Sequence, residues 1–295
     1  MIPQHRTHQS GPAAPVSRRS HDSRVVSGPR RRAVFAAGGV LVLVAGLSGC
    51  GADAGEDGAP ERRSFAFSGK TLTIDAGNTS LDLLPDDGKG AGDGDGKAGG
   101  DGGASGDVRV TRWFSGWSAL GGGVKQVWEM KGNTLRLDTD CQGLIDNCDS
   151  RHEVRVPRGV AVVVNGDNGS VTATGFDTGL SLTTGNGSVR VRDVSGALRL
   201  ETDNGKVKGT GVTSRQVSAT ANNGSVEVGF RSVPGRVDTV TDNGSISLGL
   251  PDAAYRVETR TGNGRVDVSV DRDSGSAHHI TARTGNGRIS IQPAD

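Results

Sequence analysis

Six histidines carry the side chains that could act as general bases or metal ligands near neutral pH. Three of them lie within the first 49 residues, and His152, His278 and His279 lie in the rest of the chain. Adjacent residues of a strand point to opposite faces, so His278 and His279 are not expected to hold one metal ion together. We interpret His152 as a residue at the start of a strand and the histidine pair as ordinary loop residues.

Catalytic motifs are missing from the sequence, which has no serine-centred nucleophile elbow, zinc-binding helix or phosphate-binding loop. A polysaccharide-processing enzyme would need acids or bases clustered on one outward strand face. The matching outward positions instead vary along the chain: Thr172, Arg190, Lys208, Glu227, Ser247, Asp267 and Ser290. We interpret them as a solvated ladder in which Arg190 and Lys208 lie near Glu227 and, further along, Asp267. We therefore expect no enzymatic activity, no catalytic residue and no cofactor.

The segment Asp86 to Asp107 is rich in glycine and aspartate and resembles calcium-binding loops only loosely. In an EF-hand register that starts at Asp93, position twelve is Ala104 rather than a bidentate acid. The nonapeptide calcium-roll pattern also fails, because no apolar residue recurs among the glycines. We expect a disordered surface insertion at 86–107 and no metal site.

One aromatic cluster contains all three tryptophans: Trp113, Phe114, Trp117 and Trp128. If exposed, they could stack on sugar rings or contact a partner. Alternatively, they form a cap over the first unit of a repetitive fold. We favour the cap, because the ends of such folds need covering and the repeats contain few other large residues.

The N-terminus predicts export and lipid attachment. Three arginines (30–32) precede an apolar run at 33–47, and Leu47-Ser48-Gly49-Cys50 follows. The run fits a signal peptide and is shorter than the ~20 residues of a membrane-spanning helix. The tetrapeptide resembles the bacterial lipobox, which implies diacylglyceryl transfer to Cys50, cleavage before it and membrane anchoring. We expect a removed signal peptide at 1–49 and a flexible tether at 50–63; export by the general or the twin-arginine route stays open.

The two other cysteines, Cys141 and Cys148, are separated by six residues. An even pair in an exported chain predicts a disulfide that closes a small loop. A metal site at this pair would lack further ligands at suitable spacing.

Charge argues against a nucleic-acid partner. Without the first 49 residues, 27 basic and 32 acidic side chains remain, a formal charge of about −5. Only 3% of the residues are aromatic and 48 are glycines, so small apolar side chains must fill the core.

A single unit recurs seven times after residue 160, centred on an asparagine-glycine pair, with spacings of 18, 18, 19, 20, 20 and 23 residues. The pairs are Asn168-Gly169, Asn186-Gly187, Asn204-Gly205, Asn223-Gly224, Asn243-Gly244, Asn263-Gly264 and Asn286-Gly287. Small apolar residues and threonines alternate with polar residues on both sides of each pair, which predicts two strands per unit. Both residues of the pair tolerate positive φ and suit a tight corner.

Stacked identical corners, with an asparagine ladder along the stack, favour one architecture. An open meander would leave its apolar face uncovered, and a barrel of about fourteen strands would enclose a lumen too wide to fill. We therefore predict an all-β, single-domain β-solenoid at 64–295, with coils of about 18–20 residues and parallel stacking. Earlier segments, including GDVRVTRW and HEVRVPRG, are expected to form irregular N-terminal coils.

The T[GD]NGSVxV units, the preceding cysteine pair and the Val156-Pro157 turn, behind a lipobox, resemble the toast-rack, or candidate-adhesin, β-repeat family of bacterial envelope proteins. The resemblance covers roughly residues 64–295 and implies a solenoid exposed outside the cell. The biochemical role of that family is largely unassigned, and related domains accompany envelope-stress signalling components.

These features predict a non-catalytic lipoprotein that presents a solenoid as a structural, adhesive or binding module on the outer face of the cytoplasmic membrane or the cell surface. Its expected partners are the membrane, through the lipid anchor, and either envelope polysaccharide or another envelope protein. The alternatives are an accessory or sensor component of envelope-stress signalling and, less favoured, a polysaccharide-processing solenoid enzyme.

Overall fold

A computed structural model describes residues 60–88, 106–119, 123–142 and 145–294, without the side chains of 117–119 and 145–147. The described residues all belong to one compact unit, Asp53–Asp295. They form 21 strands and no helix, which confirms the all-β solenoid. Accordingly, no helix in these ranges could cross a membrane. The expected signal peptide, Cys50, nearly all of the tether and the middle of the glycine-aspartate insertion lie outside the described residues.

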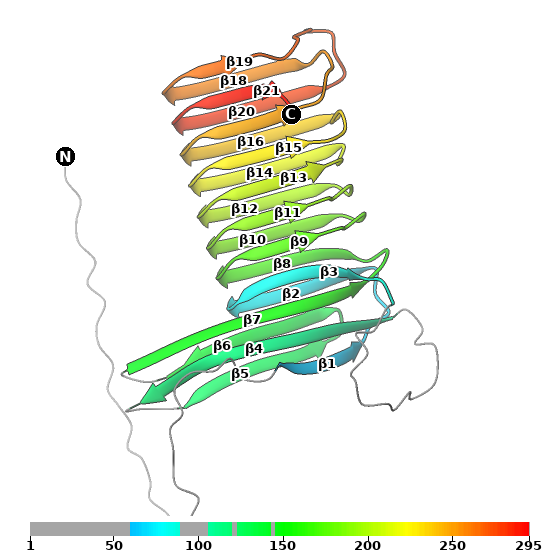
Figure 1. Cartoon of the computed structure of the whole chain (residues 1–295), viewed down its shortest axis with the longest axis vertical. Coiled ribbons are helices and arrows are strands. Elements are labelled where there is room, and N and C mark those ends of the chain that lie inside the picture. Colours follow the sequence, from blue (N-terminus) through cyan, green and yellow to red (C-terminus); the bar gives the residue numbers. More distant parts are fainter. Residues whose placement is uncertain (1–59, 89–105, 120–122, 143–144, 295) are drawn as a thin grey trace, which may run out of the picture. The chain divides into compact units, whose positions relative to one another are not determined.

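Eight coils share one form: a strand of a ten-stranded sheet, a corner, and a strand of an eleven-stranded sheet (Figure 1). The first strands are β2 (Thr71–Asn78), β8 (Ala161–Asn168), β10 (Leu180–Asn186), β12 (Leu198–Asn204), β14 (Gln216–Asn223), β16 (Arg236–Asn243), β18 (Arg256–Asn263) and β20 (His279–Asn286). The second strands are β3 (Ser80–Asp86), β9 (Val171–Thr174), β11 (Val189–Arg192), β13 (Val207–Val212), β15 (Val226–Phe230), β17 (Ile246–Leu250), β19 (Val266–Val268) and β21 (Ile289–Pro293).

The coils stack in parallel register, with each asparagine opposite the next asparagine of the stack. The inward positions of adjacent coils therefore meet, for example Leu182 beside Leu200 in one sheet and Val189 beside Val207 in the other. These side chains are buried in one continuous hydrophobic core between the two sheets. Burial of this apolar surface, at about 25 cal/mol per Å², holds the sheets together without a further layer.

The coils do not stack in chain order at either end. The β20/β21 coil lies between β16/β17 and β18/β19, so the chain skips one level and then returns to fill it. The filled level receives Ile280, Ile289 and Ile291, whereas the terminal coil carries Val257 and Val268. Because isoleucine buries more apolar surface than valine, this order leaves the less apolar coil at the end of the stack.

At the other end, β6 (Thr134–Cys141) and β7 (Ile145–Pro157) form a further coil beneath β2/β3. It has no asparagine corner, and both of its strands run on beyond the stack. Three antiparallel strands complete this end: β1 (Glu61–Ala66) pairs with β4 (Asp107–Ala119), β4 pairs with β7, and β5 (Val124–Lys131) pairs with β6.

Two expectations for the N-terminal part are therefore wrong. The segment GDVRVTRW belongs to the antiparallel strand β4 rather than to an irregular coil, because it pairs with the long strand β7. The first strand begins at Glu61 instead of Ser64, because residues 61–63 pair with 110–112 of β4. By contrast, β6 and β7 do form a coil, as do β2 and β3.

Candidate functional site

The corner asparagines form a continuous side-chain ladder. Each Nδ2 donates a hydrogen bond of 2.7 to 3.1 Å to the Oδ1 of the preceding asparagine in the stack. The order is Asn78, Asn168, Asn186, Asn204, Asn223, Asn243, Asn286 and Asn263. Asn78 is an eighth member that the seven-unit repeat did not include, because threonine rather than glycine follows it. These amides are occupied by one another, so the ladder acts structurally.

The corner glycines are required by close packing of neighbouring backbones. A Cβ on Gly187, Gly224 or Gly244 would lie 2.0, 1.7 or 1.9 Å from the carbonyl oxygen of the preceding corner glycine. Gly169 also has a left-handed φ of 127°. None of the corner asparagines has positive φ, since Asp193 is the sole non-glycine residue with positive φ in the described ranges. The corner asparagines therefore do not use the positive φ that asparagine tolerates.

The disulfide between Cys141 and Cys148 closes the enlarged corner of the β6/β7 coil. This coil has no corner asparagine and so does not join the asparagine ladder. Hydrogen bonds of buried hydroxyl groups connect it to the adjacent coil instead. Thr139 Oγ1 donates to Ser150 Oγ at 3.0 Å, and Thr79 Oγ1 donates to the Ser150 carbonyl at 2.8 Å. The disulfide therefore closes the loop next to a small polar cluster in the core.

His152 belongs to this cluster and is fully buried, in contrast to the expected place at the start of a strand. It lies within β7 and pairs with Leu81, so it occupies the inward position that valine or isoleucine holds in other coils. Its Nδ1 is 2.8 Å from Thr79 Oγ1. Burial, aided by the nearby Arg112 charge, lowers the pKa of His152 to about 4. The imidazole is therefore neutral near pH 7, and its complete burial keeps it from substrates.

The other two histidines lie far along the stack from His152. His278 is half-buried in the loop before β20, and its Nδ1 is 2.9 Å from the Pro234 carbonyl. His279 is the first residue of β20 and is also half-buried. The described residues contain no group of three or more His, Cys, Asp or Glu side chains that could hold a metal ion.

The aromatic residues do not form one patch. Trp128 is 6% exposed, and the guanidinium carbons of Arg63 and Arg112 lie 4.1 and 4.3 Å from its ring centre. Strand alternation places Trp113 on the opposite face of β4 from Arg112, and Trp113 instead contacts Arg151. Phe114 is half-buried, and Trp117 lies in β4 with its side chain outside the described set. This arrangement supports the cap for Trp128 and removes it as a sugar-stacking surface.

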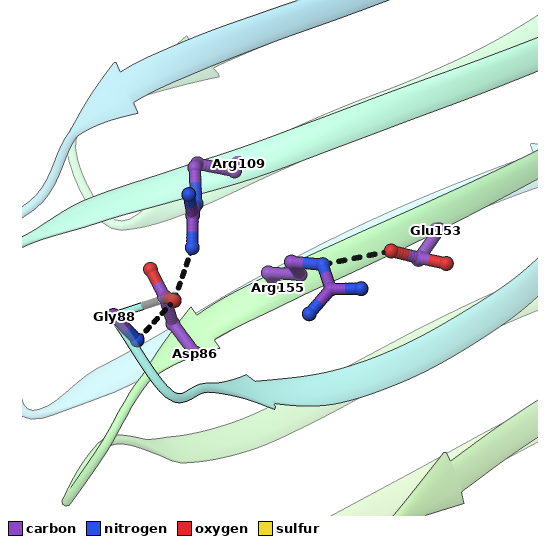
Figure 2. Close-up of polar contacts among 5 residues, drawn as sticks. All are labelled: Asp86, Gly88, Arg109, Glu153 and Arg155. Carbon is purple, nitrogen blue, oxygen red and sulfur yellow. Dashed lines mark hydrogen bonds and ion pairs between the residues drawn. The ribbon is translucent and has the colours of Figure 1, made fainter. Parts of the chain in front are cut away.

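An ion pair holds together the two ends of the glycine-aspartate insertion, and a second one lies nearby on β7 (Figure 2). Arg109, near the start of β4, forms an ion pair with Asp86 at the end of β3, and Gly88 N donates to the same carboxylate at 2.9 Å. Arg155 donates separately to Glu153 at 2.9 Å. The Asp86–Arg109 pair joins β3 to β4, whereas Arg155 and Glu153 both belong to β7. Because each carboxylate is bound to an arginine, the two do not form a pair of free acids.

The outer face of the eleven-stranded sheet carries a group of neighbouring positive charges. Arg190 lies directly opposite Lys208 on the next strand, although like charges in this position repel. Lys208 is bound to Glu227 at 3.1 Å, and hydrogen bonds from Lys206 and then Lys208 lower the pKa of Glu227. Arg190 and its neighbour Arg192 are exposed and have no ion-pair partner among the described residues.

These arginines border a hollow of about 220 Å³ that is lined by Thr172, Arg190, Val191, Arg192, Lys208 and Thr210. Thr210 also lines an adjoining open depression of about 590 Å³, over strands β13, β15, β17 and β21. We call these two hollows together the outer-face groove. One end of the groove carries cationic side chains, and the other is lined by glycines together with polar side chains such as Glu227, Ser247 and Gln292.

The floor of the groove is open because Gly229 and Gly249 have no side chains. A Cβ on Gly249 would have its nearest contact at 3.7 Å, and one on Gly229 at 3.9 Å, so the backbone does not require glycine there. From the sequence, the outward positions four residues after each corner asparagine were compared as possible site residues. The outward positions six residues after each asparagine, which include Arg192 and Gly249, were missed. Continuing the same alternation by two residues would have found them. The expected proximity of Asp267 was wrong, because the displaced terminal coil puts it beside Ser290.

The comparisons with known proteins agree with the repeat. The family model described as Toastrack DUF4097 matches residues 155–292. No curated protein matches the chain with significance.

Among solved structures, a candidate adhesin from Bacteroides fragilis is similar at 14% identity over 79% of this chain and 97% of its own, with a TM-score of 0.44. A candidate adhesin from Parabacteroides merdae is similar at 7% identity over 81% and 97%, with a TM-score of 0.41. A candidate cell adhesion protein from Clostridium sporogenes is similar at 12% identity over 80% and 100%, with a TM-score of 0.37. Residues 155–292, which contain the asparagine-glycine repeat, are therefore similar to the Toastrack DUF4097 family.

Proposed function

We propose that this chain is a non-catalytic surface lipoprotein, anchored through Cys50, whose solenoid binds anionic envelope polysaccharide along the outer-face groove. The observation that carries the proposal is the pair of exposed arginines, Arg190 and Arg192, that have no acidic partner at the edge of a bare floor. Arginine guanidinium groups bind carboxylate and phosphate with paired hydrogen bonds.

The fold supports an extended ligand rather than a compact one. Neighbouring strands of a sheet lie about 4.8 Å apart, so equivalent outward positions repeat along the stack at nearly the length of one sugar unit. Arg190, Lys208 and Glu227 occupy consecutive strands in register. A polymer that runs across the strands would meet cationic groups first and then the glycine floor.

The repulsion between Arg190 and Lys208 also favours an anionic ligand. Like charges opposite each other destabilise a sheet by a few tenths to about 1 kcal/mol. Glu227 offsets this repulsion only on the side of Lys208. A bound anion would neutralise Arg190 in the same way.

The test uses the exported chain from residue 50 onward, with Cys50→Ser to prevent acylation. Binding of polygalacturonate, and of neutral dextran of similar length, is measured by calorimetry. We expect binding of polygalacturonate only, weakened by salt, and a loss of at least ~tenfold in affinity for Arg190→Gln/Arg192→Gln.

The matched control removes two arginines from the outer face of the ten-stranded sheet, as Arg199→Gln/Arg236→Gln. Both positions are exposed, and each arginine is already paired with a carboxylate. The control should keep the affinity. No binding of polygalacturonate, or equal losses in both double variants, would rule out this groove as the site.

A further inference from the structure

The solenoid ends abruptly at its last coil, in both sheets at once. Strand β18 is the last of the ten-stranded sheet and β19 is the last of the eleven-stranded sheet (Figure 1). The inward residues of this coil are only partly covered: Val257 and Val268 are half-buried, and Val266 is 37% exposed. Val266 is the one exposed large hydrophobic residue in the described ranges.

The open edge of β18 presents free backbone groups at alternate residues. In parallel pairing, the amide and carbonyl of one residue point to one neighbour, and those of the next residue point to the other side. Arg256 N donates to the His278 carbonyl, so the backbone groups of Arg256 point toward the neighbouring strand β20. The N–H and C=O groups of Val257, Thr259 and Thr261 therefore point to the open edge.

A short segment of the chain limits how far this edge extends. Tyr255 N donates to the Asp271 carbonyl, and Asp273 N donates to the Tyr255 carbonyl, so the edge is occupied at Tyr255. The free stretch thus begins at Arg256 and ends at the corner, Asn263. A long, flat and open strand of this kind is a template for pairing with another strand.

We propose that this edge pairs with the same edge of a second copy of the chain, as an antiparallel two-fold dimer centred on Thr259. In this register Glu258 of each copy lies opposite Arg260 of the other, and Val257 lies opposite Thr261. Inward residues meet inward residues, so the two apolar cores become continuous. Both ion pairs fall at non-hydrogen-bonded positions, where side chains of opposed strands are closest.

Charge and the occupied edge exclude the neighbouring registers. A shift that pairs Val257 with Thr259 places Glu258 opposite Glu258, and one that pairs Thr259 with Thr261 places Arg260 opposite Arg260. A register centred on Val257 would place Thr259 against Tyr255, whose edge is already filled. The register centred on Thr259 pairs residues 256–262 of the two copies and is isologous, as a two-fold dimer requires.

In the single chain, the positive charge of Arg260 at this edge has no acidic partner among the described residues, and a second copy would supply one. Arg260 lies opposite Arg283 of β20, and neither has an ion-pair partner among the described residues. Glu258 of the second copy would approach Arg260 from the open side. At the other end of the stack the edge strands are β1 and β5, which pair antiparallel with β4 and β6 and differ in sequence from β18, so this charge register has no counterpart there.

The test is a set of charge exchanges in the chain from residue 50 onward with Cys50→Ser, studied by analytical ultracentrifugation. We expect a dimer for the parent chain and at least a ~tenfold weaker one for Glu258→Arg and for Arg260→Glu alone. The double variant Glu258→Arg/Arg260→Glu should dimerise again. An equimolar mixture of the two single variants should form a heterodimer, because each then presents the charges that the other lacks.

The control Glu201→Arg changes an outward glutamate on the interior strand β12 and should leave dimerisation unaltered. Circular dichroism checks that every variant keeps its β-structure. A monomeric parent chain, or a dimer that survives both single exchanges, overturns the proposal. Dimerisation is measured without polysaccharide, so its failure and the failure of the groove to bind polygalacturonate are separate results.

Discussion

At the scale of single residues, threonines complete the corners. Two residues before the asparagine, an inward threonine donates its hydroxyl to a corner-glycine carbonyl of the preceding coil in five coils: Thr184, Thr202, Thr241, Thr261 and Thr284. Ala221 stands at the same position in the β14/β15 coil, with Thr202 and Thr241 on either side of it. The Gly205 carbonyl therefore lacks this hydroxyl donor.

Ala221→Thr should raise the free energy of unfolding by about 0.5–1 kcal/mol, because it adds a hydrogen bond at a site whose neighbours already accommodate threonine. Urea denaturation measures the change. The reverse control, Thr202→Ala, should lower stability by about 1 kcal/mol or more, since it leaves the Gly187 carbonyl without its donor. A destabilised Ala221→Thr would show that the β14/β15 coil is too tightly packed for the hydroxyl.

His152 should make stability depend on pH. Its pKa is about 4 in the folded protein and close to 6.5 when unfolded, so between these values the unfolded chain binds more protons. Stability should therefore fall as the pH is lowered from 6.5 to 4, by up to roughly 3 kcal/mol.

His152→Leu places at this position the residue that Leu81 provides in the adjacent coil. Thr79 keeps its bond to the Ser150 carbonyl in this variant. Urea midpoints measured at several pH values should then lose the part of the slope that lies between pH 4 and 6.5. An unchanged slope would mean that other groups cause it.

At the scale of the elements, the corner and the strand use glycine for different reasons. A Cβ at Gly224 would overlap a backbone carbonyl of the adjacent coil, whereas one at Gly249 would make ordinary contacts. Corner glycines are thus fixed by stacking, and floor glycines are free to vary as far as the backbone is concerned.

Gly224→Ala should lower the free energy of unfolding by more than about 1 kcal/mol, because a whole coil must move to admit the methyl group. The matched variant Gly249→Ala should be neutral or stabilising by up to ~1 kcal/mol, since glycine in a strand costs conformational entropy. Thermal denaturation compares the two. Equal losses in both would contradict the close approach at the corners.

At the scale of the whole molecule, the two ends of the stack differ. One end is completed by antiparallel strands, the buried Trp128 and a disulfide, and the other stops at the edge strands β18 and β19, each paired on one side only. The first described strand, β1, stands at the completed end of the eleven-stranded sheet. The open end therefore lies at the opposite end of the stack from the strand that follows the tether.

If Cys50 is the lipid anchor, as proposed, Cys50→Ala should abolish lipid attachment, because it removes the thiol that would accept the diacylglyceryl group. The protein should then remain unprocessed or leave the membrane fraction. Metabolic labelling with a fatty acid and fractionation of cells measure both outcomes. Membrane retention with normal maturation would show that Cys50 is not the anchor.

The sequence by itself determined the coils. Their alternating small apolar residues and the regular asparagine-glycine pairs depend only on neighbours along the chain and on one repeated contact, so spacing alone predicted two strands per coil and parallel stacking. The disulfide followed from the same local reasoning, through an even cysteine pair in a chain whose N-terminal sequence predicts export.

Only the tertiary structure decided the order of the coils, the completed end, the burial of His152 and the outer-face groove. The exchange of the last two coils depends on which one buries more apolar surface, and every coil in the array carries the same local pattern. His152 lies after the corner of the β6/β7 coil, which has no asparagine-glycine pair. Without that pair, the sequence offers no reference position from which to predict that His152 points inward. The groove joins residues from coils up to about 120 positions apart, Thr172 and Gln292 among them, and only their stacking brings them onto one face.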